Sequence, residues 1–256
     1  MSDELSFGAY PMVDEGQATG RVAGVFADLL STGMPFVPSL FKSLALCPPY
    51  LVLAHDQVRS VLPGPASAEA AQHLARGVRD AVEPPRDPEV REHLARFVEP
   101  SSQMLLASAG LLEALEGGLT APAARDRRLP VRPVRPQGHL PATDESPDRE
   151  LYGRIRAGLG TPVVNSAWRS LSAAGHLRAA WSALEPQLAT ALPVADQLQG
   201  RARAAARALP WGSAASPQAL AAHGVEDAAP GMRSVLRTYL LTLSRLLVLT
   251  ACAAQD

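Results

Sequence analysis

Side chains that could carry chemistry are thinly spread in this chain. The two cysteines, Cys47 and Cys252, are far apart and form no C-x-x-C spacing, which argues against a disulfide framework and a cysteine-based metal or redox site. No metal and no organic cofactor are predicted. Four histidines also lack metal-ligand spacing, and each is interpreted as a surface residue: His73, His93, His176 and His223.

The isolated acids offer few candidates for a general base, which must lie beside the reacting group. Asp56 directly follows His55, so the two side chains cannot share a helix face, and Asp56 is interpreted as solvated. Glu185 precedes a proline at a helix end and is expected at the surface. Asp196 opens an Ala- and Arg-rich helix, where its charge meets the helix dipole favourably.

The strongest pattern is a block that occurs twice, at Gly33–Leu62 and at Gly160–Leu188. Both copies begin with Gly-x-Pro-x-Val-x-Ser and continue with an aromatic residue and a cation. The separation of about 127 residues is far longer than a solenoid repeat of roughly 20–50 residues and indicates a duplicated half. The matching pairs are Gly33 with Gly160, Pro35 with Pro162, Val37 with Val164, Ser39 with Ser166, Phe41 with Trp168, Lys42 with Arg169, Ser43 with Ser170, and Leu44 with Leu171.

The Gly-x-Pro-x-Val-x-Ser motif has a structural interpretation and a functional one. Structurally, glycine ends one helix, proline fixes the direction of the chain, and Ser or Asn caps the next helix. Functionally, the equivalent helix starts of a pseudo-two-fold pair face each other, and such interfaces often hold small-molecule pockets. Amides at two facing helix starts suit a small carboxylate.

The side chains after the motif also have two interpretations. Lys42 and Arg169 either hold a carboxylate or lie at the surface with their charged ends in water. Trp168 and Trp181 are interpreted as core residues on separate helices, with Trp168 the better candidate for a pocket wall.

Helices must position these blocks, because apolar residues recur at three- and four-residue spacing and no useful strand alternation occurs. We predict an all-α protein of two homologous helical repeats, residues 1–118 and 148–256, packed as a pseudo-dimer and joined by a Pro-rich linker at 119–147. The main expected helices are Ala18–Leu30, Ser39–Cys47, Tyr50–Leu62, Ser67–Val82 with Ser67 as N-cap, Asp87–Phe97, Ser101–Leu115, Leu151–Leu159, Pro193–Leu209 and Gly231–Ala254.

Composition limits the functional classes. The chain has 256 residues, 47% of them hydrophobic, and a net charge of −1, which favours neither nucleic acid nor an anionic membrane surface. Its beginning lacks the basic and apolar segments of a signal peptide. The apolar run Tyr239–Ala254 contains Arg245 and is short for a membrane span, so we interpret it as a buried core helix. A soluble cytoplasmic protein is expected.

The duplicated block, its order of elements and the helix before its first copy resemble the group I 2-haloacid dehalogenases, the DehI family, over roughly Ala18 to Val248. The resemblance implies two helical repeats with an active site between them. It also implies hydrolysis of a small 2-halocarboxylic acid, in which water displaces halide at the α-carbon without a covalent intermediate and without a cofactor. The helix Ala18–Leu30 is also similar to the opening of the AhpD-like fold, whose redox members use a C-x-x-C that is absent here.

Carried over by position, the family's catalytic residues are incomplete in this chain. The Ser-Asp pair that activates water falls on Asn165 and Ser166, so a serine stands where the base is expected. The Asn that holds the water falls near Ser101. The resemblance places Phe41 and Tyr239 in the aromatic wall of the site, and Pro38, Trp168 and Arg169 are the further candidates for substrate binding.

Three hypotheses therefore stay open. The chain is a hydrolase of the haloacid dehalogenase type, or a non-dehalogenating relative that binds a small organic acid or an apolar ligand between the repeats, or an interaction protein without a pocket. A homodimer is also possible.

Overall fold

The computed structural model describes residues 12–31, 36–125 and 147–254 of the chain. Within these residues the protein is built from α-helices and short 3-10 turns, with a single isolated bridge between Ala123 and Ala214 and no strand. The predicted all-α class is confirmed. Gly33 and Pro35 of the first block and most of the predicted linker, residues 126–146, lie outside the described residues.

The helices follow the same order in both halves of the chain. The first half contains α1 (Gly20–Ser31), α2 (Ser39–Leu44), α3 (Pro48–Val61), α4 (Pro65–Arg76), α5 (Pro88–Ala95) and α6 (Val98–Leu115). The second half contains α7 (Arg149–Leu159), α8 (Ser166–Ala173), α9 (Leu177–Leu184), α10 (Leu188–Arg207), α11 (Pro217–Ala222) and α12 (Ala229–Ala251). The 3-10 turns are η2 (Glu15–Gln17), η3 (Arg79–Ala81), η5 (Glu185–Gln187) and η6 (Glu226–Ala228).

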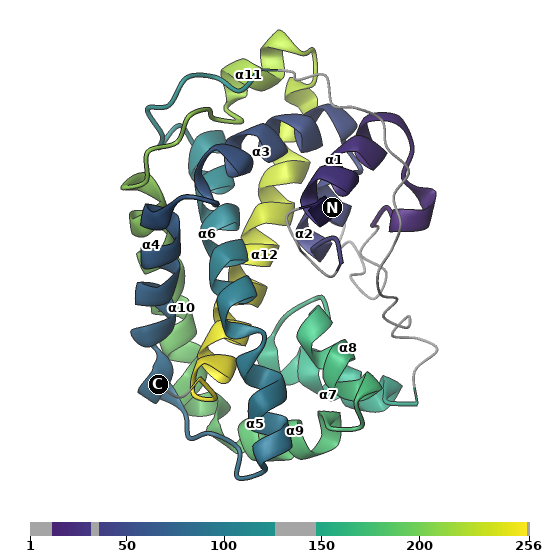
Figure 1. Ribbon diagram of the computed structural model, residues 1–256, viewed down its shortest axis with the longest axis vertical. Helices are drawn as coiled ribbons and strands as arrows, with labels where there is room; N and C mark the ends of the chain where they lie inside the picture. The colour runs from purple at the N-terminus through teal and green to yellow at the C-terminus, as the bar shows by residue number, and fades with distance from the viewer. Residues whose placement is uncertain (1–11, 32–35, 126–146, 255–256) are drawn as a thin grey trace, which may run out of the picture.

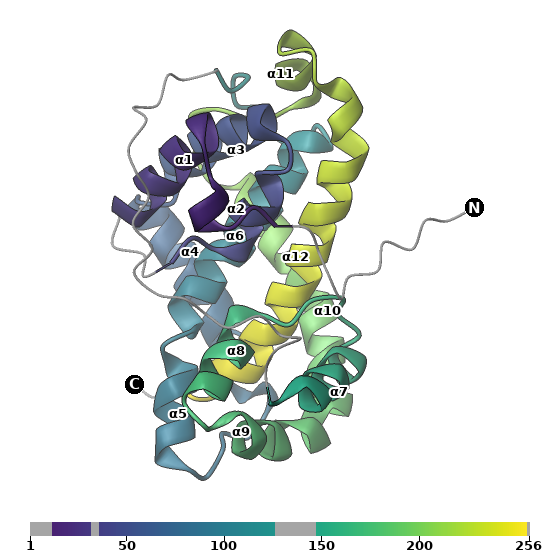
Figure 2. The same cartoon turned by 90° about the vertical axis from the view of Figure 1, so that its right-hand side faces the viewer.

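The last helix of each half runs through the centre of the molecule. α6 and α12 make the most extensive helix–helix contact, and α10 packs against both (Figures 1 and 2). α1, α2 and α3 gather around one end of this central unit, and α7, α8 and α9 around the other. The segment Glu226–Ala251 is long and apolar enough to cross a membrane, but 72% of its most apolar window is buried inside the protein. It is therefore a core helix, as predicted.

Local sequence signals explain most helix starts. Asp87 caps α5 by accepting from the amides of Glu89 at 2.9 Å and Val90 at 3.5 Å. Ser67 is not a cap, as the sequence suggested, because α4 begins earlier at Pro65, where the fixed φ of proline suits the first turn. The prediction that α10 starts at Pro193 was also wrong, since the helix begins at Leu188 and includes this proline.

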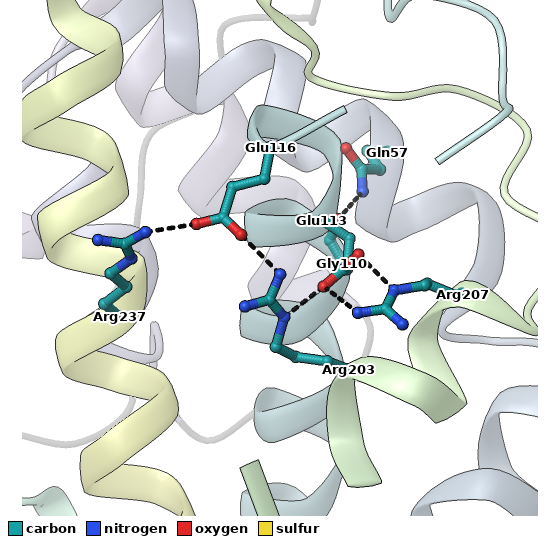
Figure 3. A network of polar contacts seen from close by, with 7 residues as sticks. All are labelled: Gln57, Gly110, Glu113, Glu116, Arg203, Arg207 and Arg237. Atoms are coloured by element: carbon teal, nitrogen blue, oxygen red, sulfur yellow. Dashed lines mark hydrogen bonds and ion pairs between the residues drawn. The ribbon is translucent and has the colours of Figure 1, made fainter. Parts of the chain in front are cut away.

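A buried carboxylate connects the two halves through arginines (Figure 3). Glu113 on α6 has only 2% of its side chain exposed and forms ion pairs with Arg203 and with Arg207, the latter at 2.6 Å. Glu116, one turn later, pairs with Arg203 at 2.6 Å and with Arg237 of α12 at 2.7 Å. The Arg-rich composition of α10 thus serves a contact with α6.

Glu113 also makes stability depend on pH. Burial alone would raise the pKa of Glu113, but the hydrogen bonds from Arg207 and Arg203 outweigh it, so this pKa lies below its ordinary value of 4.5. The folded state therefore binds this proton less readily than the unfolded chain. The resulting stabilisation is present above about pH 4.5 and is lost as the pH falls through the folded-state pKa.

We predict that Glu113→Gln lowers the free energy of unfolding by about 1–3 kcal/mol at pH 7, because its arginine partners lose their hydrogen bonds to a buried carboxylate. The loss should shrink as the pH falls below about 4.5, where the native carboxylate is itself protonated. Urea unfolding at pH 7 and pH 3 measures both effects. Glu92→Gln, which breaks only the exposed pair with Arg96, is the control and should change stability little. An equal loss in both variants would contradict the role of Glu113.

A second prediction concerns close packing at Gly110 on α6. A Cβ atom at Gly110 would lie 2.3 Å from the ring of Trp211, which is held by a 2.7 Å hydrogen bond from its Nε1 to the carbonyl of Ala206. Gly110→Ala should therefore cost about 1–3 kcal/mol through overpacking. Gly200→Ala in α10 meets no atom within 4 Å and should stabilise the protein by about 0.5–1 kcal/mol. Thermal unfolding of both variants checks the difference in sign.

Candidate functional site

The first block meets the last helix through a buried polar contact. α2 follows Pro38, its N-cap residue, and Phe41 on the helix is fully buried. The hydroxyl groups of Ser43 on α2 and Tyr239 on α12 form a hydrogen bond of 3.0 Å. Phe41 and Tyr239, which the resemblance expects in the walls of a pocket, are thus buried inside the protein. The hydroxyl of Tyr239 is already hydrogen-bonded to that of Ser43.

The second block starts α8 with a local cap. The Asn165 side chain accepts a hydrogen bond from the backbone amide of Ala167 at 3.1 Å, and the Ser166 hydroxyl donates to the same Asn165 oxygen at 3.2 Å. Trp168 is 1% exposed and meets Trp181 edge to face, with ring centroids 5.8 Å apart. The core interpretation of both tryptophans is confirmed. The polar groups at the predicted base position serve the helix start.

Lys42 does not extend into solvent. Its Nζ lies 3.5 Å from a carboxylate oxygen of Asp14 and 3.3 Å from one of Glu15, and its side chain is only 19% exposed. Glu15 is itself buried and accepts a hydrogen bond of 2.9 Å from the backbone amide of Val37, just before α2. The first block thus already holds two carboxylates from the N-terminal segment.

Arg169 is the equivalent cation of the second block and is half-buried. Burial lowers the pKa of its guanidinium, and the charges of Tyr152 and Asp14 oppose this shift. Asp14 thus forms an ion pair with Lys42 and acts on Arg169 through its charge. Lys42 is the block cation that directly contacts the acidic segment.

The remaining candidate residues are separate from these contacts. Ser101 is buried near the start of α6. Asp56 is half-buried on α3, Asp196 lies 3.6 Å from Arg245, and Glu185 forms a surface ion pair of 2.6 Å with Arg154. No contact joins any of these carboxylates to Ser166 in the described part of the chain.

Three of the four histidines differ from their surface interpretation, because His93, His176 and His223 are half-buried while His73 is exposed. His93 on α5 is half-buried, and its Nε2 lies 2.9 Å from the hydroxyl of Ser170 on α8, across the two halves. Burial is the main reason that the pKa of His93 falls below its usual value, and the charge of Arg96 adds to the effect. Ser170 lies within α8 and not at a helix start, so this pair has no neighbouring free amides to stabilise an oxyanion. We interpret it as a contact between the halves.

Two hollows on the described surface lie elsewhere. One of about 800 Å³ lies between η3, the segment around η5 and the end of α12, and one of about 380 Å³ lies along the exposed face of α12. Neither is lined by a residue predicted for the site. Among the described residues, no group of three or more His, Cys, Asp or Glu side chains has a geometry that could hold a metal ion.

Comparison with known proteins gives a likeness of fold. No family model matches the chain, and no curated protein matches it in sequence. A D-2-haloacid dehalogenase mutant has a TM-score of 0.75 and 20% identity, over 95% of this chain and 96% of the other. A mutant of D-2-haloacid dehalogenase in complex with D-2-CPA has a TM-score of 0.75 and 19% identity, over 95% and 94% of the two chains. The complex of D-2-haloacid dehalogenase with L-LA has a TM-score of 0.73 and 18% identity, over 95% and 96%. The chain has a haloacid dehalogenase-like fold.

Sequence reasoning missed Asp14 and Glu15, the residues that meet Lys42. They form an isolated acidic pair in a segment without helical periodicity, and their pairing with Lys42 joins residues 28 and 27 positions apart. Lys42, the cation of the first block, was the only signal in the sequence that a carboxylate lies beside α2.

We predict that Asn165→Ala costs roughly 1 kcal/mol of stability, because the amide of Ala167 loses its cap, and that Asn165→Asp costs little. Chemical denaturation of the three proteins measures the difference. An equal loss in both variants would show that Asn165 contributes something other than a cap.

Proposed function

We propose that this protein binds a small organic acid between its two helical halves, beside Lys42 of α2 and Arg169 of α8. The observation that carries the proposal is that Lys42 lies 3.5 Å from the carboxylate of Asp14 and 3.3 Å from that of Glu15, so this place already accommodates negative charge. The charge of Asp14 also acts on Arg169. A guanidinium and an ammonium together complement a carboxylate, and the buried aromatic residues nearby supply an apolar surrounding for a short carbon chain.

The comparisons support the ligand class. The similar fold extends over 95% of the chain, and one of the similar structures is a complex with D-2-CPA. The matching helix order of the halves and the central contact of their last helices support the proposed duplication. In this proposal the pseudo-two-fold arrangement gives the ligand one cation from each half.

Hydrolytic dehalogenation is the second candidate, and the similar fold favours it. Water would form a new C–O bond at the α-carbon as the C–halogen bond breaks, and its proton must pass to a base. Ser166 stands where that base is expected, and a serine hydroxyl accepts no proton at neutral pH without a neighbouring base. Its hydroxyl instead donates to Asn165. Binding without turnover is therefore the function we favour for the natural chain.

We predict that the natural chain binds D- or L-2-chloropropionate without releasing halide above a heat-inactivated control. Ser166→Asp should gain measurable halide release, because a carboxylate at the start of α8 is favoured by the helix dipole and can accept the proton. Ser166→Asn is the matched control, similar in shape but unable to act as a base. Halide release and calorimetric binding are measured for all three.

Each outcome separates the candidates. Halide release by the natural chain would support the dehalogenase and contradict binding alone. Absence of binding by all three proteins would contradict the organic-acid proposal.

A further inference from the structure

The N-terminal segment Met12–Gln17, named here the clasp, lies over the first block and its partner helix. The backbone amide of Val13 donates to the carbonyl of Lys42 at 3.1 Å, and the two carboxylates of the clasp face the Lys42 ammonium. Met12 approaches Tyr239 of α12, with 3.9 Å between the hydroxyl and the sulfur. The clasp therefore touches α2 and α12.

The two acids of the clasp are held very differently. Glu15 is buried, belongs to the turn η2 and accepts from the amide of Val37, so it anchors the clasp. Asp14 has 71% of its side chain exposed, and its contact with Lys42 is long, at 3.5 Å. Exposed ion pairs of this kind are weak. One carboxylate is thus fixed in the structure, while the other is exposed to solvent beside Lys42.

The cation of the first block differs in type from the other basic residues of the chain. Lys42 is the only lysine, whereas every other cationic side chain apart from histidine is an arginine. A lysine ammonium is a compact charge with three freely rotating donors and can change partners without the fixed fork geometry of a guanidinium. It is therefore suited to sharing between an internal carboxylate and an incoming one.

We propose that Asp14 is a built-in carboxylate occupant of the organic-acid site, which competes with the small acid for Lys42. The inference rests on the proposed function, because it names the regulation of that same site. A carboxylate carried by the chain itself has a high effective concentration at Lys42, in the millimolar range for short flexible connections. The external acid must displace Asp14, so its apparent affinity is lower than the site alone would give.

Asp14→Asn tests the competition, because it removes the charge and preserves the size of the side chain. Calorimetric titration with DL-2-chloropropionate should give about tenfold tighter binding than in the natural chain, within the usual range of coupling between two ligands. Glu185→Gln is the matched control, since it removes an acid that pairs with an arginine on the surface of the second half, and it should bind like the natural chain.

The single lysine provides a second readout that needs no ligand. Acetic anhydride can modify only Lys42 among the side-chain amines, and mass spectrometry follows its rate. The rate should rise several-fold in Asp14→Asn and stay unchanged in Glu185→Gln, because only the first variant loosens the clasp. Unchanged labelling in Asp14→Asn would overturn the inference, since Asp14 would then not cover the ammonium.

The outcomes distinguish failure of the inference from failure of the proposed function. Equal affinity in the natural chain and in Asp14→Asn would overturn competition and leave the organic-acid site in place. Absence of binding by every variant, with faster labelling in Asp14→Asn, would overturn the proposed function together with the competition. Tighter binding with faster labelling supports both.

Discussion

The contact between α6 and α12 is the constraint on which the rest of the structure depends. Every residue from Met104 to Leu115 of α6 is buried, and most of α12 is buried as well. A helix that is buried on all sides must be enclosed by other helices, and α12, α10 and α4 enclose this part of α6. The short helices of the blocks attach to this centre. α2 packs on α12, and α8 packs on α5, which itself contacts α12. The geometry of the site therefore follows from the position of the long helices.

Glu113 is the polar exception within this apolar centre. A buried carboxylate without partners would be strongly destabilising, and a well-packed apolar residue would often stabilise as much as the ion pairs do. The arginines therefore compensate the cost of burying the Glu113 charge, and their ion pairs also fix how α10 lies on α6. Arginine suits this task because its planar fork can bridge two carboxylates, as Arg203 bridges Glu113 and Glu116.

Local signals in the sequence predicted the helices well, whereas contacts between distant segments were not predictable. Asp87 predicted the start of α5 because its side chain accepts hydrogen bonds from backbone amides within the next three residues. The start of α4 was misplaced because Pro65 offers a helix start two residues before Ser67. The pairing of His93 with Ser170 joins helices 77 positions apart and leaves no periodic trace in either segment. The clasp is too short for a helical period, and its position depends on hydrogen bonds and ion pairs with residues more than 20 positions away, which sequence spacing does not encode.

The candidate site separates the requirements of binding from those of catalysis. Binding a small acid needs positive charge and apolar cover, and in the proposed site Lys42 and Arg169 supply the charge while buried aromatic residues supply the cover. Displacement of a halide also needs a proton acceptor beside the attacking water. At the start of α8 the serine hydroxyl donates to Asn165 and the asparagine caps the helix, so both side chains are engaged in local structure. Ser166 is the first residue of α8 after its cap Asn165, and the first turn of a helix favours an acidic side chain through the helix dipole. The proposed absence of turnover thus rests on the serine at this position and on Ser101, where the resemblance expects the asparagine that holds the water.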